Sequence, residues 1–148
     1  MTLKNIKENA TITLVNERTS ENEKDRVEFT TAGRFHEKDG KFYILYKEHE
    51  DMGMGNSSVL FKIEDDSVIM RRNGDFRTVI VYRENEFADI LYRTPLGEMT
   101  MKLKTEKIEN NLRNDGGELR FSYFLFMNGE ETHNKIFLKV KPERIDSV

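Results

Sequence analysis

The chain has 148 residues, of which 34% are charged, with a formal net charge of -3 and no cysteine. This length suits one domain with one core, and we predict a single domain over residues 1–148. The lack of cysteine excludes disulfides and a thiolate site, and the mixed, slightly acidic charge argues against nucleic-acid binding despite the arginines at 71, 72 and 77. No segment resembles a signal peptide or a membrane span, so we expect a cytoplasmic protein that does not enter a membrane.

Strand signals follow one another along the chain. Runs rich in β-branched and aromatic residues occupy residues 11–15, 25–35, 41–46, 59–63 and 78–82, and a long run covers residues 99–113. Turn signals separate them at Asp39-Gly40, Met52 to Gly55, Asp65-Asp66, Asn73-Gly74, Glu84-Asn85, Pro95-Leu96-Gly97, Asp115-Gly116-Gly117 and Asn128-Gly129. No window has a useful helical period. The pattern predicts an all-β domain of about ten strands.

The turn positions also predict which residues face each other, because a tight hairpin of known loop length has a determined register. The predicted pairs are Phe35 with Ile44, Tyr46 with Phe61, Glu48 with Val59, Phe61 with Met70, Val59 with Arg72, Met70 with Val79, Arg72 with Arg77, Val79 with Ile90, Arg77 with Tyr92, and Tyr92 with Met99. One face of each strand is apolar and the other is mainly charged, which is typical of a sheet with one buried side. We therefore predict a single antiparallel meander that closes into a barrel.

Polar residues interrupt the apolar inner face toward one end of the predicted barrel. They are Thr31, Glu48, Arg72, Arg77 and Tyr92, and Tyr46 lies beside them on the same face. We expect Glu48 and Arg72 to meet inside the barrel, across the strand that carries Val59. Two arginines against one carboxylate would leave a positive charge in a poorly hydrated place, and this predicts a small amphipathic anion as the ligand of these six residues.

Three interpretations of this inner cluster stay open. Glu48 and Arg72 could form a buried ion pair with a purely structural role, anchor a ligand in a partly open cavity, or supply a catalytic carboxylate. No partner makes the catalytic interpretation specific, so we expect a non-enzymatic protein without a cofactor. A solid barrel would instead favour a structural or protein-interaction module, and the inward aromatic residues Phe29, Phe35, Phe42, Phe61, Phe121 and Tyr123 could fill a narrow barrel.

Two further features concern metals and partners. The predicted register places His36, His49 and His133 too far apart to share one ion, so we expect no metal site. Phe124, Phe126 and Phe137 fall on the outer face, where they form an apolar patch. A second copy of the chain or the N-terminal arm would cover it, and we favour a homodimer.

Several short segments, taken in order, carry a family resemblance. They are residues 29–33 (FTTAG), 46–48 (YKE), 53–54 (GM), 71–74 (RRNG), 92–97 (YRTPLG) and 117–119 (GEL). With these segments, which span most of the chain, the sequence resembles the YwiB-like family of uncharacterised bacterial β-barrel proteins. The resemblance implies a barrel of the lipocalin or calycin type. It implies no activity and no catalytic residues, because the family is a domain of unknown function.

Overall fold

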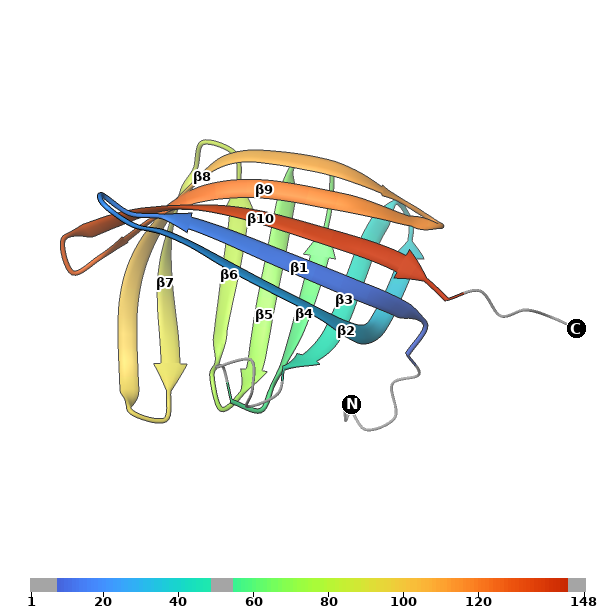
Figure 1. Ribbon diagram of the computed structural model, residues 1–148, viewed down its shortest axis with the longest axis horizontal. Coiled ribbons are helices and arrows are strands. Elements are labelled where there is room, and N and C mark those ends of the chain that lie inside the picture. Colours follow the sequence, from blue (N-terminus) through green and yellow to red (C-terminus); the bar gives the residue numbers. More distant parts are fainter. Residues whose placement is uncertain (1–7, 49–54, 144–148) are drawn as a thin grey trace, which may run out of the picture.

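The computed structural model describes residues 8–48 and 55–143, and these residues form ten strands (Figure 1). The strands are β1 (Ala10–Thr19), β2 (Lys24–Lys38), β3 (Lys41–Glu48), β4 (Ser57–Ile63), β5 (Ser67–Gly74), β6 (Thr78–Arg83), β7 (Phe87–Thr94), β8 (Gly97–Arg113), β9 (Gly116–Met127) and β10 (Glu130–Pro142). Within the two described stretches, no helix is long and apolar enough to cross a membrane. His49 and most of the predicted turn from Met52 to Gly55 lie outside the described residues.

The strands form one antiparallel sheet that closes almost completely into a barrel. Their order around the sheet is β6-β5-β4-β3-β2-β1-β10-β9-β8-β7, so consecutive strands are neighbours. The two ends of the sequence meet in the middle of this order, because β1 pairs with β10 along its whole length. In Figure 1 β1, β2, β9 and β10 cross in front of β3 to β6, so the sheet forms two facing walls. The buried apolar core includes residues of both walls, such as Ile12 on β1 and Ile44 on β3. The predicted all-β meander barrel is confirmed.

Several predicted turns and registers are confirmed as well. Asp39-Gly40 and Asn128-Gly129 both have positive φ angles, which is the backbone conformation that two-residue hairpin turns require. The turn at Asp39-Gly40 pairs Phe35 with Ile44 as predicted. Across β4 and β5, Phe61 pairs with Met70 and Val59 pairs with Arg72, also as predicted.

The register of β3 against β4 differs from the prediction by two residues. Tyr46 pairs with Val59 instead of Phe61, and Glu48 pairs with Ser57 instead of Val59. A shift of two residues keeps every side chain on its predicted face, because strand side chains alternate with a period of two. Tyr46 and Phe61 therefore still stack inside the barrel, with ring centroids 6.4 Å apart.

The predicted register of β5 against β6 is wrong by one residue. The side chain of every residue in β6 therefore lies on the opposite face of the sheet from the predicted one. Arg72 pairs with Thr78, and Met70 pairs with Ile80. Gly74 is not a turn residue but the last residue of β5: it pairs with Ser57, and a Cβ atom on it would lie 2.3 Å from the carbonyl oxygen of Asn56. The chain turns one residue later than predicted.

The consequence is that Arg77 and Val79 point outward. Both are exposed, whereas Thr78, Ile80 and Tyr82 are buried. The predicted pairs of Val79 with Ile90 and of Arg77 with Tyr92 are wrong for the same reason, since Arg77 lies opposite Arg93.

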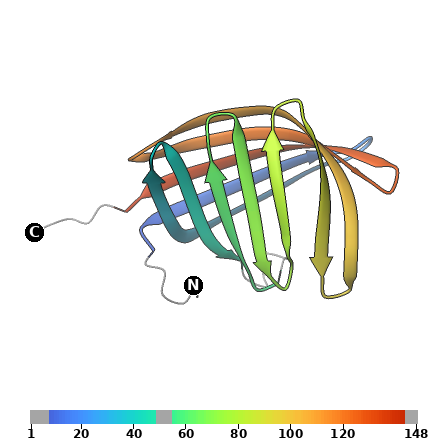
Figure 2. The same cartoon turned by 180° about the vertical axis from the view of Figure 1, so that it is seen from behind.

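The barrel closes between β6 and β7 through few contacts, and we call this junction the seam. In the described residues the only ladder pair across it is the bridge of Arg77 with Arg93, which has two backbone hydrogen bonds of 2.9 Å. Thr78 adds one side-chain hydrogen bond, from its Oγ1 to the carbonyl oxygen of Leu91 at 2.9 Å. Figure 2 views the molecule from the side on which β6 and β7 lie.

Candidate functional site

Three polar side chains meet inside the barrel, from strands that are not neighbours in the sheet. Glu48 ends β3, Arg72 lies on β5, and Tyr92 lies on β7. Arg72 donates from Nε to Oε1 of Glu48 at 2.9 Å and from Nη2 to Oε2 at 3.0 Å, which makes a two-pronged ion pair. Its Nη1 donates to the hydroxyl of Tyr92. The predicted approach of Glu48 to Arg72 is therefore confirmed, with Tyr92 as their neighbour.

This cluster is largely shielded from water. The Glu48 side chain is 3% exposed and the Arg72 side chain is 14% exposed. Burial disfavours the charged guanidinium, but the hydrogen bond to Glu48 and the nearby Tyr92 outweigh it, so the pKa of Arg72 is raised. Burial also raises the pKa of Tyr92, against the opposing effect of Arg72. The guanidinium and the carboxylate meet as a two-pronged ion pair in matched geometry.

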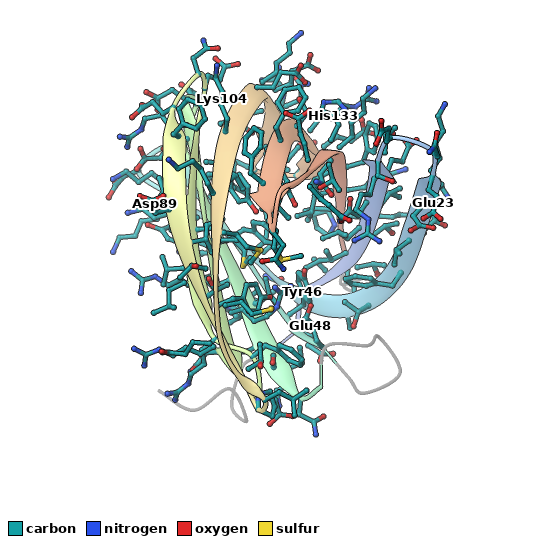
Figure 3. All side chains as sticks on the ribbon, turned by 90° about the vertical axis from the view of Figure 1, so that its left-hand side faces the viewer. Glu23, Tyr46, Glu48, Asp89, Lys104 and His133 are labelled. Carbon is teal, nitrogen blue, oxygen red and sulfur yellow. The ribbon has the colours of Figure 1, made fainter. Side chains whose placement is uncertain are left out.

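The cluster borders a partly open interior cavity of about 360 Å³. Its lining comes from all ten strands and consists of Leu14, Asn16, Val27, Phe29, Tyr46, Glu48, Phe61, Met70, Arg72, Ile80, Tyr82, Ile90, Tyr92, Met101, Leu103, Phe121, Tyr123, Leu125 and Ile136. Glu48 and Arg72 are the only charged residues among them. In Figure 3 Tyr46 and Glu48 lie in the space between the walls of the barrel, whereas Asp89 points outward. The barrel is not solid, because the inward aromatic residues leave this space free.

Tyrosines supply most of the remaining polar atoms of the cavity. Burial raises the pKa of Tyr46, with Glu48 as the second cause, and burial raises the pKa of Tyr82. Burial also raises the pKa of Tyr123 to about 12, against a hydrogen bond with Tyr82 that lowers it. All of these hydroxyls stay protonated at neutral pH. They are hydrogen-bonding groups without charge.

One acceptor in the cavity wall is left without a partner. The Oδ1 atom of Asn16 is buried, and no residue that the structure describes donates a hydrogen bond to it. Asn16 lies on β1, between its pairing partners Ile136 on β10 and Val27 on β2. The other such atom among the described residues is Oγ1 of Thr105, which does not line the cavity. A buried acceptor without a donor is costly, so Asn16 marks a place where a ligand or water donor would be stabilised.

Comparisons with known proteins agree with this architecture. Residues 12–138 match the family model described as "Domain of unknown function (DUF1934)". The chain belongs to this family. It is 25% identical over 107 residues to the "Uncharacterized beta-barrel protein YwiB" of Bacillus subtilis (strain 168). The aligned region covers 72% of this chain and 74% of that protein. The crystal structure of the ywiB protein superimposes with a TM-score of 0.80 at 20% identity, covering 93% of both chains. The predicted resemblance to the YwiB-like family is confirmed.

The DUF1934 fold brings together four of the six predicted site residues. Tyr46, Glu48, Arg72 and Tyr92 all line the cavity. Arg77 does not, because the register of β6 turns it outward. Thr31 does not line the cavity either. It pairs with Ile12 on β1, and its hydroxyl donates to the carbonyl oxygen of the adjacent Ala32 at 3.4 Å, while the pairing of β2 with β3 ends at Gly33.

The sequence prediction missed Asn16 as a site residue. The expected strand stopped at Val15, whereas β1 continues to Thr19. The alternation of Ile12 and Leu14 on the inner face, continued by two residues, would have placed Asn16 inside.

In the described part of the chain, no three or more histidine, cysteine, aspartate or glutamate side chains are grouped so that they could hold a metal ion. His36 on β2 faces Tyr43 on β3. His133 contacts Glu106 through Nε2 at 2.9 Å, and Ser122 donates to the same Oε1 atom at 2.8 Å. The carboxylate lies between the serine and the imidazole, so this order differs from that of a catalytic triad, in which the histidine contacts the serine directly.

The outer aromatic residues have neighbours on the barrel surface. Phe124 lies beside His133, Phe126 lies beside Phe87, and the guanidinium of Arg120 lies 5.3 Å from the ring centre of Phe137. All three predicted patch residues are half-buried. Self-association through this surface stays a prediction.

Proposed function

We propose that this protein binds a small amphipathic molecule in the barrel interior and does not transform it chemically. The observation that supports binding best is the cavity of about 360 Å³, a volume within the range of small-molecule sites, with the unpartnered Oδ1 of Asn16 in its wall. Aromatic rings of Phe29, Phe61 and Phe121 provide the apolar surface. The hydroxyls of the cavity tyrosines provide the few polar groups that orient a ligand.

We further propose that the polar group of the ligand is uncharged. The sequence-based expectation of an anion depended on two inner arginines against one carboxylate. Arg77 lies outside, and Arg72 is already held by both oxygens of Glu48. A ligand carboxylate would therefore add an unbalanced negative charge to a poorly hydrated interior, which is unfavourable. A hydroxyl, amide or amine N–H fits better, because it can donate to Asn16.

The alternative of a solid structural barrel has less support. Phe35 and Phe42 stack with ring centroids 5.8 Å apart, at the end of the barrel near the turn of β2 and β3. Phe61, Phe121 and Tyr123 form a second aromatic group. The cavity remains beside this second group, since all three of its members line it.

Native mass spectrometry of protein purified gently from cells tests the proposal. We expect one retained small molecule of uncharged amphipathic character. Ile80→Phe should abolish its retention, because Ile80 lines the cavity. The matched control is Val81→Phe, since Val81 is the next residue of the same strand and is 38% exposed on the outer face. Equal retention by both variants would place the ligand elsewhere, and a barrel that retains nothing and binds no neutral amphipathic reporter would contradict the proposal.

A further inference from the structure

The outer surface of the seam carries a cluster of arginines over three neighbouring strands. A shallow pocket of about 440 Å³ lies there. Its outward-pointing residues are Arg71 and Asn73 on β5, Arg77 directly before β6, Val79 on β6, and Leu91 and Arg93 on β7. The pairing places them in two rows. Asn73, Arg77 and Arg93 form one row at the closing bridge, and Arg71, Val79 and Leu91 form the next. We call this set the seam pocket.

The charges of the seam pocket are not balanced. Arg93 has a carboxylate partner, because its Nε lies 3.1 Å from Oε2 of Glu98. Arg77 donates from Nε to Oδ1 of Asn73 at 3.2 Å, and this amide is neutral. Among the residues that the structure describes, no carboxylate forms an ion pair with Arg71 or Arg77. Three guanidinium groups against one carboxylate leave two net positive charges.

Two of these arginines face each other at the only ladder pair that closes the barrel. Arg77 and Arg93 exchange two backbone hydrogen bonds, so their side chains leave the same face of directly opposite residues. Like charges directly opposite on antiparallel strands are destabilising. An anion that contacts both guanidinium groups would remove this repulsion. It would also link β6 to β7 where the barrel has few other contacts.

We propose that the seam pocket binds a phosphate monoester. A phosphate dianion matches the two net positive charges, and its oxygens match the planar, two-pronged donor geometry of arginine. Val79 is 49% exposed and Leu91 is 42% exposed, and together they offer an apolar surface next to the arginines for the organic group of the ester. Arg72 borders both this pocket and the interior cavity. The three arginines that would hold the phosphate, Arg71, Arg77 and Arg93, are exposed on the outer face.

The proposal also predicts that the ligand stabilises the folded barrel. A ligand that binds only the native state stabilises it by RT ln(1 + L/Kd), where L is the free ligand concentration, so the unfolding temperature rises with the ligand concentration. Here it would do so far from the turn at residues 84–86 that connects β6 to β7, at the end where the described residues of the two strands are held together by one ladder pair and the hydroxyl of Thr78. Inorganic phosphate should bind more weakly than an ester with an aromatic group, since it lacks a group to contact Val79 and Leu91.

The test uses phenyl phosphate and inorganic phosphate at constant ionic strength, with binding measured from the arginine side-chain NMR signals and from the unfolding temperature. We expect phenyl phosphate to bind the full chain and to raise its unfolding temperature. Arg77→Gln and Arg93→Gln should each weaken binding at least tenfold, and Arg77→Lys should weaken it less because it keeps the charge. Arg83→Gln is the control, since Arg83 lies on the outer face of β6 outside the pocket.

A parallel arm identifies the source of the phosphate. Vesicles of phosphatidylcholine with phosphatidic acid present the same phosphate monoester on a lipid, and plain phosphatidylcholine vesicles are their control. Binding to phenyl phosphate alone indicates a soluble ester, and binding to the phosphatidic acid vesicles that is lost in Arg77→Gln indicates the lipid. The proposal is overturned if neither probe binds, or if Arg83→Gln weakens binding as much as Arg77→Gln, which would indicate diffuse charge attraction.

Discussion

Arg72 and Arg77 lie five residues apart in the sequence, on either side of the same turn, and their surroundings differ in every respect. Arg72 points into the barrel, where its side chain is 14% exposed and both oxygens of Glu48 accept its hydrogen bonds. Arg77 points outward, where its strand neighbour is Arg93 and its hydrogen-bond partner is the neutral amide of Asn73. The interior provides full charge compensation for one guanidinium, and the surface provides none for the other.

This difference shows that access to water determines which charged side chains need a partner of opposite charge. A buried guanidinium without a carboxylate would lose its hydration and gain nothing in return, so its partner must come from the chain. At the surface, water and salt screen like charges, so opposed arginines are tolerated and stay available to a ligand. The predictions that follow test this contrast, starting from the change that should cost most.

Replacement of Glu48 by glutamine should destabilise the protein strongly. The amide keeps the shape of the carboxylate but leaves the charge of Arg72 buried and unpaired, so we expect a loss of about 3–5 kcal/mol in the free energy of unfolding. Urea denaturation at neutral pH measures it. The double variant Glu48→Leu with Arg72→Met should recover much of this loss, because it removes both charges together. A loss below about 1 kcal/mol for Glu48→Gln would mean that water reaches Arg72.

The cavity tyrosines should make stability depend on pH in the alkaline range. Burial raises the pKa of Tyr82 and raises that of Tyr123 to about 12, whereas unfolded tyrosine titrates near pH 10. A pKa that is higher in the folded state stabilises it fully below pH 10, and this stabilisation is lost as the pH rises toward 12. We expect the unfolding temperature to fall over this range. Phenolate absorbance of these tyrosines near pH 10 in the folded protein would show that the cavity is wetter than its burial indicates.

Replacement of Arg77 by leucine should change stability very little. Its guanidinium is exposed and has no carboxylate partner in the described residues, so we expect a change within about 0.5 kcal/mol. The sign should depend on salt. At low ionic strength the variant should be slightly more stable than wild type, since the repulsion between Arg77 and Arg93 is gone. Added sodium chloride should cancel this difference in stability. A loss of several kcal/mol, like that expected for Glu48→Gln, would contradict the outward placement of Arg77.

Much of this contrast could be predicted from the sequence. The error in the predicted register of β6 has a local cause. Regular turn signals and one apolar face per strand were enough to predict the barrel and the meeting of Glu48 with Arg72. The error lay at Gly74, whose sequence context is that of a turn. The structure uses it for close approach to the carbonyl oxygen of Asn56, which only a glycine allows. A contact with a distant residue of this kind cannot be inferred from the dipeptide Asn73-Gly74 alone.

A signal for the correct register was present in β6 itself. Residues 78–82 are apolar or β-branched on both faces, so their alternation alone does not choose a face. Arg77 and Arg83 both share the face of Val79, whereas Thr78, Ile80 and Tyr82 have no charged residue on theirs. Weighing the flanking charges would have turned Val79 and Arg77 outward. The weak seam between β6 and β7 could not be predicted in this way, because it depends on how the whole barrel closes.

The central claim is that the interior accepts a neutral amphipathic ligand, and a pair of matched fluorescent reporters tests it most directly. N-phenyl-1-naphthylamine is uncharged and carries one N–H donor, and 8-anilinonaphthalene-1-sulfonate adds a sulfonate to the same skeleton. We expect the neutral reporter to bind at least tenfold more tightly, a difference of about 1.4 kcal/mol. Its binding should be lost in Ile80→Phe and kept in Val81→Phe. Equal affinity for both reporters, with both lost in Ile80→Phe, would contradict a neutral interior site, and binding of the neutral reporter that Ile80→Phe leaves unchanged would contradict an interior site altogether.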